Sequence, residues 1–308
     1  MSKGIHHVTA IAGPVRRNLD FYTATLGLRL VKRTVNFDDP GTYHLYYGGE
    51  AGSPGTILTF FPWGDVGPGR AGAGEAGETA FRVPEGAIGF WVHRFVERSV
   101  AHEAPRRRLG ETVLAFQDPD GMRLALVAVP GAENEPAWTG GGIAAENSIR
   151  GFHGVTLDIQ EPAATGAILT DVLGFAEIGR EGDVTRHRAE GAATGGIVDL
   201  RQLGGPRGRL GAGSVHHIAF RAAGDAAQAA MVKRLADAHG IHTTEQKDRN
   251  YFRSVYFREP GGVLFEIATD DPGFAVDEPA ARLGEGLKLP SFLEGRRAEI
   301  EAALPELG

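Results

Sequence analysis

The sequence predicts an α+β fold made of four repeated units, each consisting of a strand, a helix and then further strands. Two observations support this prediction: a short, alternating, β-branched segment occurs three times, and a hairpin with an acidic-Pro-x-Gly turn occurs twice. The three similar segments are GIHHVTA (Gly4 to Ala10), GFHGVTL (Gly151 to Leu157) and SVHHIAF (Ser214 to Phe220). The two hairpins are FQDPDGMRLALVAV, which begins at Phe116, and FREPGGVLFEIA, which begins at Phe257.

Each repeated strand is followed by a segment with helical character that ends at a glycine. The clearest helix is expected over Asp225 to His239, which is rich in Ala, Met, Leu and Lys. Gly27, Gly174 and Gly240 follow the three expected helices, where a positive φ is favoured. In both hairpins, proline presets φ at the turn and glycine takes the position that needs a positive φ.

These elements divide the chain into four units and a tail. The units are expected at residues 4–63, 86–130, 150–203 and 214–270, and the tail at residues 271–308. The first strand of the second unit is expected over residues 87–92. The Gly-rich stretches 64–77 and 130–147 are interpreted as a surface loop and as the linker between the halves. A helical pattern over residues 291–304 is expected to pack the tail on the surface of a domain.

Composition excludes several classes of protein. The chain has 308 residues, 42% of them hydrophobic, no cysteine and a formal net charge of −7. Without a thiol it can form neither a disulfide scaffold nor a zinc-thiolate site, and the acidic balance argues against nucleic-acid partners. No signal peptide and no membrane span is recognisable. The protein is therefore expected to be cytoplasmic, and its oligomeric state, including a homo-oligomer, stays open.

Units with histidine on the first strand and glutamate on the last resemble the vicinal oxygen chelate superfamily, which includes glyoxalases, bleomycin-resistance proteins and extradiol dioxygenases. The resemblance covers residues 4 to about 270 and implies that the units pair into two half-open barrels. Three segments are similar to the hydroquinone-type ring-cleaving dioxygenases, namely VKRTVNFDDPGTYHLYYG (Val31 to Gly48), DRNYF (Asp248 to Phe252) and DEPAARLGEGLKLP (Asp277 to Pro290). The implied reaction is the insertion of O2 into a substituted para-hydroquinone, a small aromatic diol.

Alignment of the units identifies three candidate metal ligands. The first strands offer His7, Gly154 and His217 at the equivalent position, and the second unit offers no histidine there. The last strands offer Glu266, where the other units have Thr59, Ala125 and Leu200. Two imidazoles and one carboxylate are typical of mononuclear Fe(II) oxygenases, with Mn(II) as the alternative metal, and leave about three positions for diol and O2. Because the third unit has Gly154, the first and fourth units are expected to share the barrel that binds the metal.

Five further residues are expected to act near this metal. The resemblance implies that Tyr256 and Arg249 lie in the substrate pocket. There Tyr256 is expected either to relay a proton or to hold the hydroxyl that does not bind the metal, and Arg249 is expected to stabilise developing negative charge. Thr9 shares the face of its strand with His7 and is expected to hydrogen-bond a ligand. His6 and His216 precede the ligands, so simple alternation directs them to the opposite face, with supporting or structural roles left open.

Two other functions compete with this hypothesis. A metal-dependent isomerase or lyase of the glyoxalase kind would need a fourth protein ligand, and Thr59 and its neighbours offer no carboxylate there. A binding protein without catalysis, like the bleomycin-resistance members, would not need the three candidate ligands.

Overall fold

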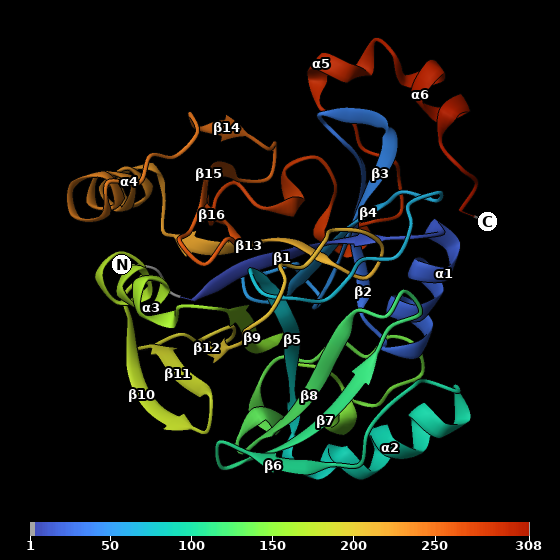
Figure 1. Cartoon of the computed structure of the whole chain (residues 1–308). Coiled ribbons are helices and arrows are strands. Elements are labelled where there is room, and N and C mark those ends of the chain that lie inside the picture. Colours follow the sequence, from blue (N-terminus) through green and yellow to red (C-terminus); the bar gives the residue numbers. More distant parts are fainter. Residues whose placement is uncertain (1–3, 308) are drawn as a thin grey trace.

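The computed structural model describes residues 4–307, and the strands of this range form two curled eight-stranded sheets (Figure 1). The first sheet has the order β14-β15-β16-β13-β1-β4-β3-β2 and the second has the order β10-β11-β12-β9-β5-β8-β7-β6. The strands of the first sheet are β1 (Ile5–Ala12), β2 (Arg29–Asn36), β3 (Asp39–Gly48), β4 (Ile57–Pro62), β13 (Val215–Ala222), β14 (Lys247–Asp248), β15 (Arg253–Arg258) and β16 (Leu264–Thr269). Those of the second are β5 (Glu75–Pro84), β6 (Arg106–Arg108), β7 (Glu111–Gln117), β8 (Arg123–Val129), β9 (Phe152–Ile159), β10 (Phe175–Glu181), β11 (Val184–Ala189) and β12 (Ile197–Gln202). The predicted α+β class with two half-open barrels is confirmed.

One helix follows the first strand of each unit. These helices are α1 (Val15–Asp20), which continues as a π-helical turn at Phe21–Thr25, then α2 (Ile88–Glu97), α3 (Pro162–Asp171) and α4 (Asp225–His239). The predicted bounds of α4, Asp225 to His239, are confirmed. Gly27, Gly174 and Gly240 have φ angles of 70°, 70° and 63°, as expected for residues that end a helix. Within residues 4–307, no helix is both long and apolar enough to span a bilayer.

The predicted start of the second unit, at residue 86 with a strand over 87–92, is wrong. Residues 88–97 form α2, in which Ile88, Trp91 and Phe95 are buried at helical spacing. The first strand of this unit is β5, which begins at Glu75 inside the Gly-rich stretch that we interpreted as a loop. The apolar run of α2 is short, so its length alone did not distinguish a helix from a buried strand.

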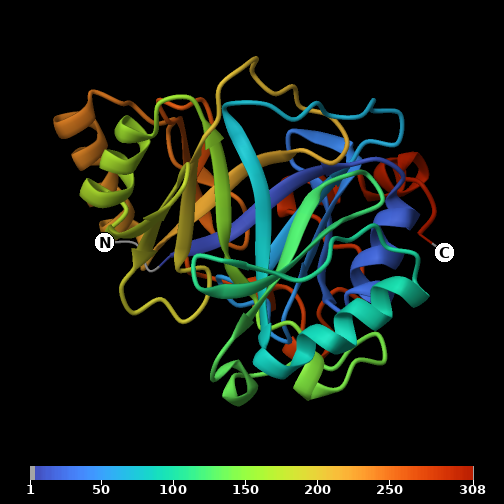
Figure 2. The same ribbon diagram turned by 60° about the horizontal axis from the view of Figure 1, so that its bottom comes forward.

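The first sheet joins segments that are far apart in the chain. β1 pairs with β4 in parallel and with β13 in antiparallel fashion, and β13 pairs in parallel with β16. Residues 5–62 and 215–269 thus form one sheet, whereas the second sheet uses residues 75–202 (Figure 2). In the second sheet β5 and β9 pair as β1 and β13 do in the first.

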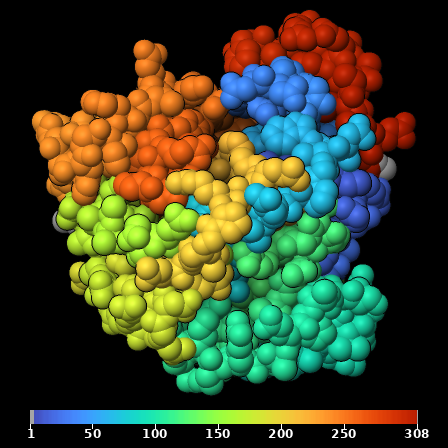
Figure 3. Space-filling model, in the orientation of Figure 1, coloured from blue at the N-terminus to red at the C-terminus, as the bar shows by residue number. Residues whose placement is uncertain are grey.

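The tail packs on the outer strands of the first sheet. It contains the short helices α5 (Ser291–Glu294) and α6 (Arg297–Ala303), and Figure 3 shows it against the segment around β2 and β3. Near its end, the backbone carbonyl of Leu307 accepts a hydrogen bond of 2.7 Å from Arg16. The expectation that the tail lies against a domain surface is confirmed.

Candidate metal centre

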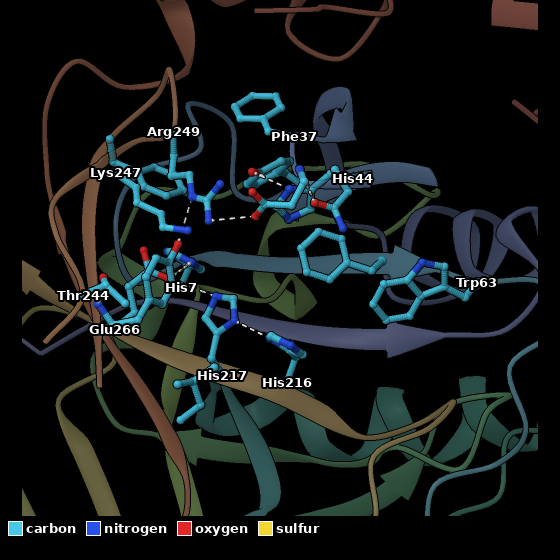
Figure 4. A pocket seen from close by; sticks show the side chains of 17 residues that line it. His7, Phe37, His44, Trp63, His216, His217, Thr244, Lys247, Arg249 and Glu266 are labelled. Carbon is cyan, nitrogen blue, oxygen red and sulfur yellow. Dashed lines mark hydrogen bonds and ion pairs between the residues drawn. The ribbon is translucent and has the colours of Figure 1, made fainter. Parts of the chain in front are cut away.

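Three neighbouring strands bring His7, His217 and Glu266 together. β1, β13 and β16 lie side by side, with Thr9 opposite His217 and Ala219 opposite Glu266 in the ladders. Nε2 of His7 lies 3.4 Å and Nε2 of His217 lies 2.9 Å from Oε2 of Glu266. Within residues 4–307 this is the one group of three or more His, Cys, Asp or Glu side chains whose ligand atoms all lie within 4.8 Å of one another (Figure 4).

The environment of Glu266 fits a cation at this point. Its side chain is fully buried, Oε1 accepts a hydrogen bond from Ser254, and Oε2 has no well-aligned hydrogen bond among the described residues. Burial alone would raise the pKa of Glu266, but the neighbouring imidazoles of His7 and His217 outweigh it and hold that pKa well below its usual value. A buried carboxylate oxygen that faces two imidazole nitrogens is a donor set that suits a divalent transition metal.

Each candidate histidine ligand is hydrogen-bonded by the histidine before it. Nδ1 of His6 lies 2.9 Å from Nδ1 of His7, and Nδ1 of His216 lies 2.8 Å from Nδ1 of His217. Simple alternation, which directed His6 and His216 away from the ligands, is therefore wrong. The register shifts between Ile5 and His7 on β1, and β13 has the matching extra residue at His216. Such β-bulges re-aim side chains toward a site.

This pairing leaves the Nε2 atoms free to bind a metal. Burial, and then the charge of His7, lowers the pKa of His6 well below 6.5. Burial, and then the charge of His217, lowers the pKa of His216 to about 4. Both rings are therefore neutral at pH 7 and can accept a hydrogen bond at Nδ1 from Nδ1–H of the next histidine. A ligand histidine that donates at Nδ1 has its lone pair at Nε2, directed toward Glu266.

A cavity of about 380 Å³ opens over the three side chains. Its wall is mostly aromatic, with His44, Tyr46, Phe61, Trp63, Phe252 and Tyr256 among the lining residues. Figure 4 shows the cationic side chains of Lys247 and Arg249 on the side of the cavity opposite Trp63. The cavity can therefore hold a flat aromatic molecule with a polar group at one end.

Arg249 and Tyr256 form a pair in this cavity. Nε of Arg249 donates a hydrogen bond of 3.1 Å to the Tyr256 hydroxyl, and its Nη2 lies 3.1 Å from Oδ2 of Asp38. The Tyr256 ring lies 5.7 Å from the His217 ring. Burial, and then the charge of Glu266, raises the pKa of Tyr256, so this hydroxyl stays protonated at neutral pH.

Within residues 4–307, the Thr9 hydroxyl is hydrogen-bonded to Thr59 and not to a candidate ligand, contrary to our expectation. Its hydroxyl accepts a hydrogen bond of 3.0 Å from Thr59, whose Oγ1 lies 2.8 Å from Nε2 of His44. The Tyr46 hydroxyl completes this chain at 2.9 Å from Nδ1 of His44. Thr59 is the position from which a fourth metal ligand would come, and its hydroxyl is engaged in this chain.

Residues 75–202, which the structure describes in full and which form the second sheet, contain no equivalent group of candidate ligands. A side chain at Gly154 would begin 2.2 Å from the carbonyl oxygen of Ile197, so histidine cannot occupy this position without a shift of backbone. Instead, the interior of the second sheet contains an ion network, in which Arg186 contacts Asp199 at 2.8 Å and Glu111 at 2.5 Å. The histidine of this strand, His153, lies 3.2 Å from Glu111.

Several residues that line the cavity were missed in the sequence. Asp38 lies at the tip of the β2–β3 hairpin, Lys247 on the edge strand β14, and Thr244 in the segment before it. The segment from Val31 to Gly48 contains Asp38, so its similarity to the dioxygenases was the available signal for this residue. Nothing in the local pattern around Thr244 or Lys247 indicates a site.

Comparisons with known proteins agree with this geometry. The model of the Glyoxalase/Bleomycin resistance protein/Dioxygenase superfamily matches residues 4–126 and 152–267. The chain is 47% identical over 301 residues to MhqO of Bacillus subtilis (strain 168), whose name describes a candidate ring-cleaving dioxygenase, covering 98% of this chain and 95% of that one. It is 33% identical to the chlorohydroquinone/hydroquinone 1,2-dioxygenase of Sphingobium indicum, covering 97% of this chain and 94% of that one.

Solved structures share the fold of this chain. One crystal structure is of a Bacillus subtilis protein that is described as a candidate dioxygenase. It superposes on this chain with a TM-score of 0.95 at 46% identity, covering 100% of this chain and 98% of that one. Glyoxalase I from Zea mays has a TM-score of 0.66 at 13% identity, covering 87% of this chain and 92% of that one. The likeness to the maize protein concerns the fold alone.

Proposed function

Because the chain belongs to the glyoxalase/bleomycin resistance protein/dioxygenase superfamily, we propose that it is a ring-cleaving dioxygenase that inserts O2 into a substituted para-hydroquinone. His7, His217 and Glu266 would hold one Fe(II) ion, with Mn(II) as the alternative. The observation that carries the proposal is their convergence, with a buried and unsatisfied carboxylate oxygen, on the floor of an aromatic cavity.

An Fe(II) ion held by these three side chains would offer a site for a phenolic oxygen and would relay electrons from the diol, which is oxidised, to O2. The protein contributes orientation and proton transfer. The Tyr256 hydroxyl is protonated and close to His217, so it can donate a hydrogen bond to a substrate oxygen above the centre. Arg249 holds that hydroxyl at 3.1 Å and places a fixed positive charge where negative charge develops on the diol.

The aromatic wall favours a ring substrate and keeps water from it. The ring centres of Phe61 and Trp63 lie 5.5 Å apart on one side of the cavity, and the tilted ring of His44 lies 4.3 Å from that of Phe61. The relative from Sphingobium indicum is named for chlorohydroquinone and hydroquinone, in which the two hydroxyls are para to each other. In a para-diol only one hydroxyl can reach the metal, so the second can extend toward the polar end near Arg249 and Lys247.

Oxygen uptake tests this proposal directly. Protein purified without oxygen and loaded with Fe(II) or Mn(II) is assayed with methylhydroquinone, chlorohydroquinone and catechol in parallel. We expect one O2 consumed per ring cleaved and faster turnover of the hydroquinones than of catechol. Faster turnover of catechol would reject the substrate class, and the absence of uptake with all three diols would reject the dioxygenase. Glu266→Ala is the matched inactive control.

The two competing functions have less support. The isomerase hypothesis needs a fourth ligand, and Thr59 presents a hydroxyl that is bonded to Thr9 and His44 instead of a carboxylate. A binding protein without a metal would leave Glu266 buried with an unsatisfied oxygen, which is unfavourable.

A further inference from the structure

We propose that the C-terminal tail is part of the catalytic apparatus, because a buried ionic contact between the tail and β2 holds Tyr251 and thereby positions the segment Arg249 to Phe252. This inference rests on the proposed function for the meaning of the site. It assigns Tyr251, Lys32 and Asp277 as positioning residues, none of which lines the cavity.

The contact begins at Lys32, whose side chain is completely buried. Its Nζ lies 2.5 Å from Oδ1 of Asp277 and 2.5 Å from Oε2 of Glu278, and both carboxylates belong to the tail. A buried ammonium group is strongly unfavourable unless it is paired. The tail must therefore stay against β2 for Lys32 to remain satisfied.

The carboxylate of Asp277 also binds a residue outside the tail, Tyr251. The other oxygen of Asp277 accepts a hydrogen bond of 3.0 Å from the Tyr251 hydroxyl. Nζ of Lys32 lies 5.0 Å from the centre of the Tyr251 ring. The tail also stacks Phe274 on that ring at 5.0 Å, and the Gly273 amide donates to the Tyr251 carbonyl at 2.9 Å. Tyr251 is thus held by the tail through its hydroxyl, its ring and its backbone.

Tyr251 lies between two residues that contact the site. Before it, Arg249 contacts Tyr256 in the cavity. After it, the Phe252 ring packs 4.9 Å from the ring of His7 and 5.2 Å from that of His6. The Arg249 amide donates to the Phe252 carbonyl at 2.9 Å, which closes the segment into a tight turn. Because the turn is closed, a displacement of Tyr251 displaces both its neighbours.

The turn itself contains strain that needs support. Asn250 has a φ of 67°, which is uncommon for a residue other than glycine. Its backbone amide donates to Asp248 at 2.7 Å. Two hydrogen bonds to Oδ2 of Asp277 anchor the turn to the tail, one of 3.0 Å from the Tyr251 hydroxyl and a longer one of 3.5 Å from the Asn250 side chain, so the Tyr251 hydroxyl is the stronger anchor. Loss of that anchor is expected to loosen the turn while the strands beside it remain paired.

The experiment compares Tyr251→Phe with Tyr47→Phe. Each change removes one hydroxyl and retains the ring, and each hydroxyl is the donor in one hydrogen bond, at 3.0 Å to Asp277 and at 2.9 Å to Asn18. Tyr47 is fully buried in the same sheet, and its hydroxyl bonds to Asn18 and not to the turn or the tail, so it is the matched control. Backbone amide exchange over residues 248–253 is measured by mass spectrometry, and turnover is measured with methylhydroquinone.

We expect exchange over the turn to be about tenfold faster in Tyr251→Phe than in the parent and unchanged in Tyr47→Phe. The kcat for methylhydroquinone is expected to fall by about tenfold in Tyr251→Phe alone, since Arg249 is then misplaced. Asp277→Ala is expected to give the same pattern with a larger effect. Equal exchange over the turn in the two tyrosine variants would overturn the inference. If the parent protein consumes no O2 with any diol, the proposed function fails, and the exchange comparison still decides the role of the tail.

Discussion

Replacing Glu266 by alanine is expected to abolish the stabilisation of the fold by a divalent metal. His7, His217 and Glu266 all come from the folded sheet and lie far apart in the unfolded chain, so the metal binds the native state and not the unfolded one. Without the carboxylate, two neutral imidazoles remain, and the metal loses its one anionic ligand. The alanine variant should therefore unfold at the same temperature with and without metal.

The size of the effect follows from linkage. A ligand at one hundred times its dissociation constant stabilises the native state by about 2.7 kcal/mol. A chain of 308 residues has an unfolding entropy of about 0.65 kcal/mol/K, at about 2.1 cal/mol/K per residue. The ratio of the two is a rise in Tm of about 4 °C for the parent protein at that metal concentration.

Scanning calorimetry with Mn(II) in place of iron measures this rise without oxidation of the metal. His153→Ala is the control, because His153 is the histidine of the equivalent strand in the second sheet and contacts Glu111 instead of a metal site. Its own Tm is expected to be lower than that of the parent, but the rise with Mn(II) should stay near 4 °C. A metal-dependent rise of normal size in Glu266→Ala would refute the ligand assignment.

Three further predictions concern the ion network and the cavity. Burial alone would raise the pKa of Glu111, but the hydrogen bonds and charge interactions that it makes with His153 and Arg186 outweigh burial and hold this pKa at about 2, below its ordinary 4.5. The ionised form therefore stabilises the fold above pH 4.5 and this stabilisation is lost as the pH falls toward 2. Glu111→Gln should accordingly lower the free energy of unfolding in urea by up to about 3 kcal/mol at pH 7 and by little near pH 2, and a difference independent of pH would contradict this. Tyr256→Phe should lower kcat by about 10²-fold with a normal Mn(II)-dependent rise in Tm, because it removes a proton donor and no ligand; a lost rise in Tm would contradict this role. Arg249→Met should likewise lower kcat by about 10²-fold at a normal metal content, and a change in KM alone would indicate a purely binding role.

The repeats made the fold and the candidate centre predictable. Equivalent positions on repeated strands can be compared within one chain, so His7 and His217 stand out against Gly154 without any other sequence. Glu266 stands out because a carboxylate in an apolar strand is rarely buried without a partner. The hairpin turns and the helix from Asp225 to His239 follow from local residue preferences, which tertiary packing here does not override.

The features of the site that the sequence did not predict depend on contacts between strands of the sheet. The inward direction of His216 comes from a β-bulge, which exists only when β13 is paired with β1 and is not a property of either segment alone. Similarly, Asp38 and Lys247 line the cavity because a hairpin tip and an edge strand meet over it. The helix α2 was mistaken for a strand because its apolar run is short, and only the packing of Trp91 and Phe95 reveals the helical spacing.

The order of strands in the first sheet has a consequence for biosynthesis. One edge of β1, whose residues are all buried, pairs with β4, but its other edge must wait for β13, and the third candidate ligand must wait for β16, which ends at Thr269. At about 5–20 residues per second, a ribosome needs about 13–50 s to make the residues between Ile5 and Thr269. The second sheet occupies the contiguous residues 75–202 and can complete its pairing during that interval. The nascent chain can pair β1 with β4 early, but the edge of β1 that faces β13 stays unpaired for most of the synthesis of these residues. The chain gains all three candidate metal ligands only after nearly nine tenths of the 308 residues have been made.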